Sequence, residues 1–241
     1  MVFTVSANRV ARWLGLVIAT FVLLYSVSLV LRHGLGHAER GGFHWLVSLD
    51  VEQNPQAWYQ ALTLFACAPL LAIAGAVARR QGERYAAYWF SVAALFAVMS
   101  VDEACALHER ISDPLRDLVG GTGALYYAWV LAWGAVGVLL LVTHARWLLA
   151  LPAATRRRFL VAGTVYVAGA MGFEMLESKL FAHGGVDIYD HLGYQLLTLC
   201  EEALEMTGVV LFIRALLLHL EAAVGTLEVR LATAARGGPT G

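Results

Sequence analysis

The residues of this chain best suited to chemistry are nine acidic and histidine side chains inside long apolar segments. They form three groups on three segments: Asp102, Glu103, His108 and Glu109; Glu174 and Glu177; and Glu201, Glu202 and Glu205. A carboxylate inside a bilayer costs at least about 2.5 kcal/mol, so it persists only where it is paired, binds a metal ion or faces a wet cavity. The three groups therefore indicate a functional site.

The composition places these residues in a membrane protein. The 241 residues are 59% hydrophobic and 15% charged, whereas soluble domains are roughly 45–50% apolar and about 25% charged. The net charge of −1 gives no general attraction to nucleic acid. The three cysteines all fall in apolar segments, where we expect them to be thiols.

Segments of about 20 apolar residues can cross the hydrocarbon core of a bilayer. The sequence predicts six such spans, at residues 12–31, 58–78, 85–108, 124–143, 159–181 and 192–219. We therefore expect an all-α, polytopic membrane helix bundle with one transmembrane domain at residues 1–219. Residues 220–241 are predicted to form a cytoplasmic tail, amphipathic or disordered.

The basic residues predict the orientation of the bundle. One set of connections and both chain ends carry most of the arginines, among them Arg9, Arg12, Arg79, Arg80, Arg156, Arg157 and Arg158. The positive-inside rule then places both termini in the cytoplasm. With a helical rise of 1.5 Å per residue, all three acidic groups fall at one level in the outer half of the membrane.

Helical spacing determines which of these carboxylates can share a metal ion. Residues three, four or seven positions apart lie on one helix face, and helix bundles build dinuclear metal sites from inward glutamates with this spacing. The predicted ligands are Asp102, Glu109, Glu174, Glu177, Glu201 and Glu205. The ligand assignment of Asp102 and Glu109 assumes one continuous third helix. His108 and Glu202 are predicted as general bases or further ligands.

An oxygen-rich ligand shell suits iron or manganese, and added imidazole suits zinc. The leading hypothesis is therefore a metal-dependent membrane enzyme, with one or two ions, acting on a lipid or another hydrophobic small molecule. An alternative is a module that carries protons or divalent cations, because chains of such residues relay protons in transporters. A third is a non-catalytic subunit, and both homo-oligomers and a membrane partner fit the sequence.

Two regions outside the acidic groups have weaker signals. His33 and His37 are four residues apart and could share a metal ion on a helix, although Gly34 and Gly36 lie between them. The aromatic run at residues 43–47 is predicted to form an interfacial helix or a short strand over the helix ends.

The segment at residues 102–109 has the pattern D-E-x4-H-E, and residues 201–208 have the pattern E-E-x2-E-M-x-G. In these two segments the chain resembles a group of uncharacterised bacterial multi-pass membrane proteins with no established activity. The resemblance covers roughly the third to sixth spans and implies a location in the bacterial inner membrane. The chain differs from membrane hydrolases that bind zinc through three histidines, because their second-half HxxxH is missing.

Overall fold

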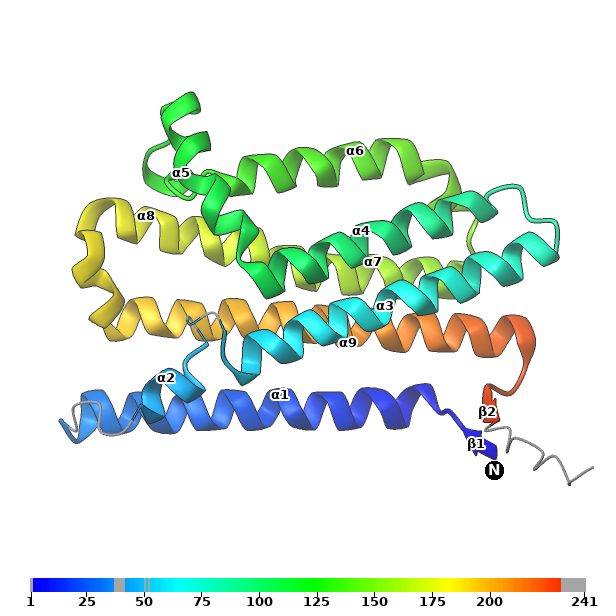
Figure 1. Cartoon of the computed structure of the whole chain (residues 1–241), viewed down its shortest axis with the longest axis horizontal. Coiled ribbons are helices and arrows are strands. Elements are labelled where there is room, and N and C mark those ends of the chain that lie inside the picture. Colours follow the sequence, from blue (N-terminus) through cyan, green and yellow to red (C-terminus); the bar gives the residue numbers. More distant parts are fainter. Residues whose placement is uncertain (1, 37–41, 50, 52, 231–241) are drawn as a thin grey trace, which may run out of the picture.

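A computed structural model describes residues 2–36, 42–49, 51 and 53–230 of the chain. Within these residues, six helical runs are long and apolar enough to cross a membrane, and they lie roughly along one axis (Figure 1). Their main helices are α1 (Ala7–Leu29), α3 (Pro55–Arg80), α4 (Ala86–Cys105), α6 (Trp129–Ala150), α7 (Ala153–Val167) and α9 (Leu192–Val224). The predicted all-α bundle with six spans is confirmed.

Shorter elements extend or connect these helices. The π-helical turn η1 (Val30–Gly34) extends α1. In the aromatic run, for which a helix or a short strand was predicted, the structure has the helix α2 (Phe43–Val47). The fifth span continues from α7 through the π-helical turn η3 (Ala168–Phe173) into α8 (Glu174–Gly184). The remaining helical pieces are α5 (Leu107–Val119) and the 3-10 turns η2 (Gly123–Leu125) and η4 (Gly185–Asp190).

Helix α9 is the central element of the bundle and packs against α1, α3 and α7. Apolar side chains fill the space between these helices. The buried Leu216 and Leu220 of α9 form one cluster with Leu71 of α3 and Trp89 of α4. A second cluster joins Tyr25 of α1 to α3 and α9. The central helix thereby has a fixed position relative to its neighbours.

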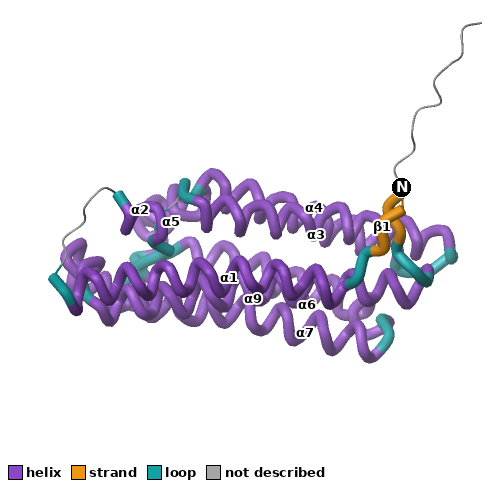
Figure 2. Tube along the Cα trace, turned by 90° about the horizontal axis from the view of Figure 1, so that it is seen from below, coloured by secondary structure: helices purple, strands orange, loops and turns teal. Residues whose placement is uncertain are grey.

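The two described ends of the chain lie together at one end of the bundle (Figures 1 and 2). Strand β1 (Val2–Thr4) pairs antiparallel with β2 (Glu228–Arg230), with Phe3 opposite Val229. Arg214 Nε also donates a hydrogen bond to Asn8 Oδ1 at 2.8 Å. Both ends are therefore on the same side of the bundle, as an even number of spans requires. The cytoplasmic assignment of that side remains a prediction.

Several predicted boundaries differ from the structure. The sixth span extends beyond its predicted end at residue 219, because α9 continues to Val224 and strand β2 follows at Glu228–Arg230. The fourth span lies further along the chain than predicted, at Trp129–Ala150. The third predicted helix, residues 85–108, was wrong at its end, because α4 stops at Cys105 and the chain turns at Ala106. Residues 231–241 of the predicted tail lie outside the described residues.

Two glycines allow the fifth and sixth spans to approach closely. A Cβ atom on Gly208 of α9 would lie 2.7 Å from the backbone nitrogen of Tyr166 on α7. A Cβ atom on Gly169 of η3 would lie 2.7 Å from the backbone oxygen of Glu201 on α9. Small residues let membrane helices pack backbone to backbone. These two contacts hold the fifth span, which carries Glu174, close to α9, which carries Glu201.

Replacing Gly208 with alanine should therefore destabilise the bundle. The added methyl group meets backbone atoms that have no room to move, and overpacking of this kind costs about 1–3 kcal/mol. The expected result is a lower melting temperature of the detergent-solubilised protein in a thermal unfolding scan. Gly163→Ala on α7 is the matched control, because its Cβ meets nothing within 4 Å. Equal melting temperatures for the two variants would contradict the close contact.

Candidate functional site

One large cavity, about 1390 Å³ in volume, runs between the helices. Its walls come from α4, α5, α6, α7, η3, α8 and α9, with a few residues at the start of α3. All nine of the acidic and histidine residues singled out in the sequence line it: Asp102, Glu103, His108, Glu109, Glu174, Glu177, Glu201, Glu202 and Glu205. The three groups, predicted from separate segments to share one membrane level, thus share one cavity.

Three of the carboxylates converge closely enough to hold one ion. Glu174, Glu177 and Glu201 each offer an oxygen, and these oxygens all lie within 4.8 Å of one another. Glu177 and Glu201 are buried, with 3% and 6% of their surface exposed. Glu174 is the first residue of α8, directly after the π-helical turn. Such turns occur often at functional sites, and here the turn precedes the pair Glu174 and Glu177.

Glu174 interacts with a tryptophan and with the neighbouring carboxyl group of Glu201. Trp129 Nε1 donates a hydrogen bond to Glu174 Oε1 at 2.9 Å, and the carboxyl groups of Glu174 and Glu201 contact one another. Among the described residues, no lysine or arginine forms an ion pair with Glu174, Glu201 or Glu205. Two carboxylates in contact away from bulk water require a shared proton or a bound cation. The cluster is therefore suited to bind a cation or to share a proton between carboxyl groups.

Helix α3 supplies two amide groups to the same site. Gln56 Nε2 donates to Glu202 Oε2 at 2.5 Å, and Gln60 Nε2 donates to Glu205 Oε2 at 3.3 Å. Asn54 caps this helix by accepting hydrogen bonds from the next backbone N–H groups, which places Gln56 within the first turn. Neither glutamine was predicted from the sequence as a site residue. Their spacing of one helical turn beside an apolar run was the available signal.

Asp102 and His108 meet through a sharp break in the chain. Ala106, between α4 and α5, has the left-handed backbone conformation with φ of 48°. His108 Nδ1 thereby comes within 3.2 Å of Asp102 Oδ2, and the His108 ring lies 5.0 Å from the ring of Trp129. The predicted shared helix face of Asp102 and Glu109 is wrong, because Glu109 lies on α5 and is exposed.

Glycine substitutions test the break in the helix at Ala106. A residue other than glycine pays roughly 1–2 kcal/mol in the left-handed conformation, so Ala106→Gly should raise the free energy of unfolding by about 1 kcal/mol. Ala104→Gly, inside α4, should instead lower it by about 0.5–1 kcal/mol. Chemical denaturation of both variants in detergent measures whether the free energy of unfolding rises or falls in each. A loss of stability in Ala106→Gly would mean that α4 continues through this position.

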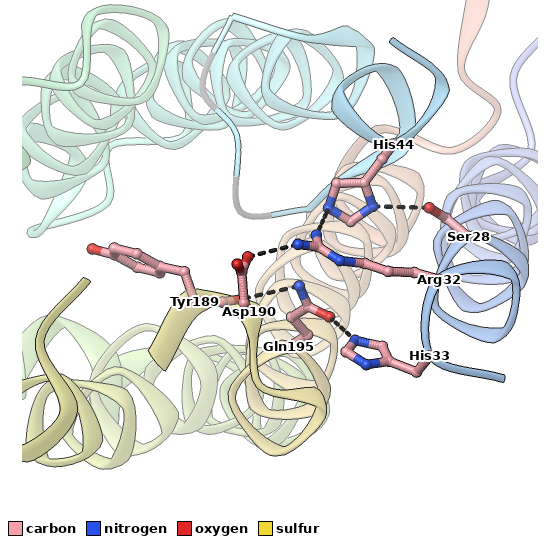
Figure 3. A network of polar contacts seen from close by, with 7 residues as sticks. All are labelled: Ser28, Arg32, His33, His44, Tyr189, Asp190 and Gln195. Carbon is pink, nitrogen blue, oxygen red and sulfur yellow. Dashed lines mark hydrogen bonds and ion pairs between the residues drawn. The ribbon is translucent and has the colours of Figure 1, made fainter. Parts of the chain in front are cut away.

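A polar network beside the cavity braces the same end of the bundle (Figure 3). Arg32 Nη2 donates to Asp190 Oδ1 at 2.6 Å, and Arg32 Nη1 lies 3.2 Å from His44 Nε2. Because a guanidinium only donates, His44 Nε2 must accept. His33 Nε2 bonds to Gln195 Oε1 at 2.7 Å. His33 is thus engaged with α9, and its predicted metal partner His37 lies outside the described residues.

A cluster of tyrosine hydroxyls lines the cavity beside the carboxylates. Tyr127 Oη lies 3.3 Å from the hydroxyl oxygens of both Tyr189 and Tyr194. Burial raises the pKa of Tyr127 well above its ordinary value, and the hydroxyl of Tyr189 acts in the same direction. Tyr127 therefore remains a neutral phenol that can donate a hydrogen bond at physiological pH. Tyr127 was not predicted as a site residue, because the sequence placed it inside the apolar fourth span at residues 124–143, whereas α6 begins at Trp129.

A family model described as a domain of unknown function, DUF8692, matches residues 15–220. The chain belongs to this family. No curated protein and no solved structure matches the chain. The matched residues contain every described residue that lines the cavity, from Leu49 to Phe212.

Proposed function

We propose that the protein is a metal-dependent membrane protein that acts on a hydrophobic substrate in its central cavity. The observation that carries the proposal is the convergence of Glu174, Glu177 and Glu201 within 4.8 Å in the wall of a membrane cavity. No lysine or arginine in the described part of the chain forms an ion pair with Glu174 or Glu201. A divalent cation would remove that electrostatic cost.

The donor set fits a hard divalent cation. Three carboxylates offer only oxygen ligands, which favour manganese or iron over metals that prefer nitrogen or sulfur. Zinc would need added imidazole, and His108 is the histidine in this part of the cavity. Glu205, which also lines the cavity, is the further carboxylate that a second ion would use. When bound, such an ion supplies Lewis-acid chemistry at the acidic end of the cavity.

The residues around this cluster can handle protons. His108 is held by Asp102 at 3.2 Å, an arrangement in which a carboxylate orients an imidazole as a general base. Glu202 is the alternative base, and its hydrogen bond from Gln56 fixes its carboxyl group. We propose that His108 accepts or delivers the proton of the reaction, with Asp102 fixing the tautomer. Neither residue belongs to the close group of three glutamates.

Metal content tests the proposal directly. Wild-type protein, purified in detergent without a metal-binding tag, should contain stoichiometric iron, manganese or zinc by elemental analysis. Glu201→Gln should bind the metal at least roughly tenfold more weakly, because loss of even an outer partner of a metal site costs that much. The exposed Glu83→Gln is the control and should keep the metal.

Metal-free wild-type protein that also fails to bind added manganese, iron or zinc would overturn the proposal. The cluster would then serve the proton or cation pathway. That function predicts flux into liposomes driven by a pH or cation gradient and abolished in Glu205→Gln. The apolar side chains that line the cavity beyond the cluster, such as Val92, Leu95 and Phe96, argue against a continuous polar route.

A further inference from the structure

Helix α6 encloses the cavity as a side wall attached at its two ends. At one end, Trp129 bonds to Glu174. At the other end, the ring of Trp147 packs edge-to-face on Trp89 of α4 at 5.0 Å, and His144 Nε2 lies 2.8 Å from Ser91 Oγ. Trp147 follows Trp129 by 18 positions, which corresponds to a rise of about 27 Å along the helix. The cavity therefore has the length of a hydrocarbon chain.

The wall between these two ends is mostly apolar, with Thr164 and Tyr166 of α7 as its polar members. From α6 it contains Trp133, Val136, Gly137, Leu140 and Leu141. From α4 and α7 it contains Val92, Leu95, Phe96, Met99, Phe159, Leu160 and Gly163. The opposite face of α6 is exposed at Val138, Leu139 and Val142, where the bilayer would surround it. The volume of about 1390 Å³ exceeds the roughly 300–1,000 Å³ of pockets for compact ligands.

An unsatisfied hydroxyl lies at the acidic end of this cavity. Ser112 of α5 lines the cavity, is only 6% exposed, and its Oγ has no hydrogen-bond partner in the described structure. Other helical hydroxyls, including those of Thr20, Ser26 and Thr143, bond back to a carbonyl of the preceding turn. A buried polar atom without a partner calls for an explanation such as a missing ligand. Ser112 therefore offers a hydrogen bond to an occupant.

The charge of the acidic end restricts the headgroup of that occupant. Among the described lining residues, Arg116 is the sole arginine or lysine, and it is paired with Asp113 at 2.7 Å. The carboxylates of the cavity outnumber the charges of one divalent cation, so an anionic headgroup would meet like charge. A cationic headgroup would compete for the glutamates that hold the ion. An uncharged headgroup avoids both conflicts.

We propose that the cavity binds a long-chain lipid with an uncharged, hydrogen-bonding headgroup of the amide or hydroxyl class. The headgroup lies at the acidic end beside Ser112, and the chain lies between α4, α6 and α7. This inference rests on the proposed function, because it names the substrate class of the same site.

Photocrosslinking of the full-length protein tests the assignment. The probe is a long-chain N-acyl ethanolamide with a diazirine in its chain, and labelled peptides are identified by mass spectrometry. We expect label on α4 and α6, removed by excess unlabelled lipid. The same chain with a phosphate or an ammonium headgroup should label these peptides less. Equal or stronger labelling by either charged probe would overturn the headgroup assignment.

Glycines in the cavity wall provide variants that block the chain without disturbing the glutamates. Added Cβ atoms on Gly137 of α6 and Gly163 of α7 meet nothing within 4 Å, so Gly137→Leu and Gly163→Leu fill open space. Each should weaken specific labelling about tenfold, equivalent to about 1.4 kcal/mol. Gly15→Leu on α1 also has free space and lies outside the cavity, so its labelling should match the wild type.

Ser112→Ala should reduce labelling by the ethanolamide and leave the melting temperature unchanged.

Metal content, measured on the same samples, separates the two proposals. Gly137→Leu and Gly163→Leu should keep the metal while losing the lipid, because neither residue belongs to the glutamate group. Wild-type labelling in both folded variants would overturn the lipid site even if the metal is present. Metal-free protein with specific labelling of α4 and α6 would overturn the metal proposal and leave the lipid site supported.

Discussion

The structure depends on one electrostatic constraint: oxygens of Glu174 and Glu201 lie within 4.8 Å of one another inside a membrane-spanning bundle, and no lysine or arginine among the described residues pairs with either. Like charges in a low-dielectric environment repel strongly unless a proton or a cation lies between them. The surrounding groups all act to hold this arrangement in place. Trp129 donates to Glu174 from α6, and Gln60 donates to Glu205 from α3. Several helices thus contribute to a site that none of them could form alone.

The close packing of the fifth span on α9 follows from the same constraint. Gly169 lies against the backbone of Glu201, and Gly208 lies against Tyr166. The π-helical turn between α7 and α8 sets the direction in which Glu174 and Glu177 face. Backbone contacts at two glycines leave less freedom than side-chain packing would, because interleaved side chains can adjust their rotamers. The glutamates are therefore positioned by backbone contacts as well as by their own hydrogen bonds.

Hydropathy predicted the six spans because a helix in lipid must satisfy every backbone group internally over about 20 residues. The helical rise and the orientation of the spans also predicted that the three acidic groups share one membrane level. In the structure, all nine of their acidic and histidine residues line the cavity. The turn at Ala106 was not predictable, because alanine favours helix and its conformation here depends on distant contacts such as that of His108 with Trp129. The glutamines of α3 were missed for a similar reason, since their partners lie about 145 residues away.

A purely structural role for the acidic cluster leaves two features of the cavity unexplained that a binding role explains: a hydroxyl without a partner in the described structure, and the space between the apolar walls. Structural polar networks in membranes are closed, with each donor and acceptor satisfied, because an open network costs more than an apolar core. Here Ser112 Oγ in the cavity wall has no partner in the described structure. The apolar walls beyond the glutamates also leave space between them, because Gly137 and Gly163 line the cavity and an added Cβ on either would meet no atom within 4 Å. A charged end joined to an apolar chamber is the arrangement that an amphiphilic ligand requires.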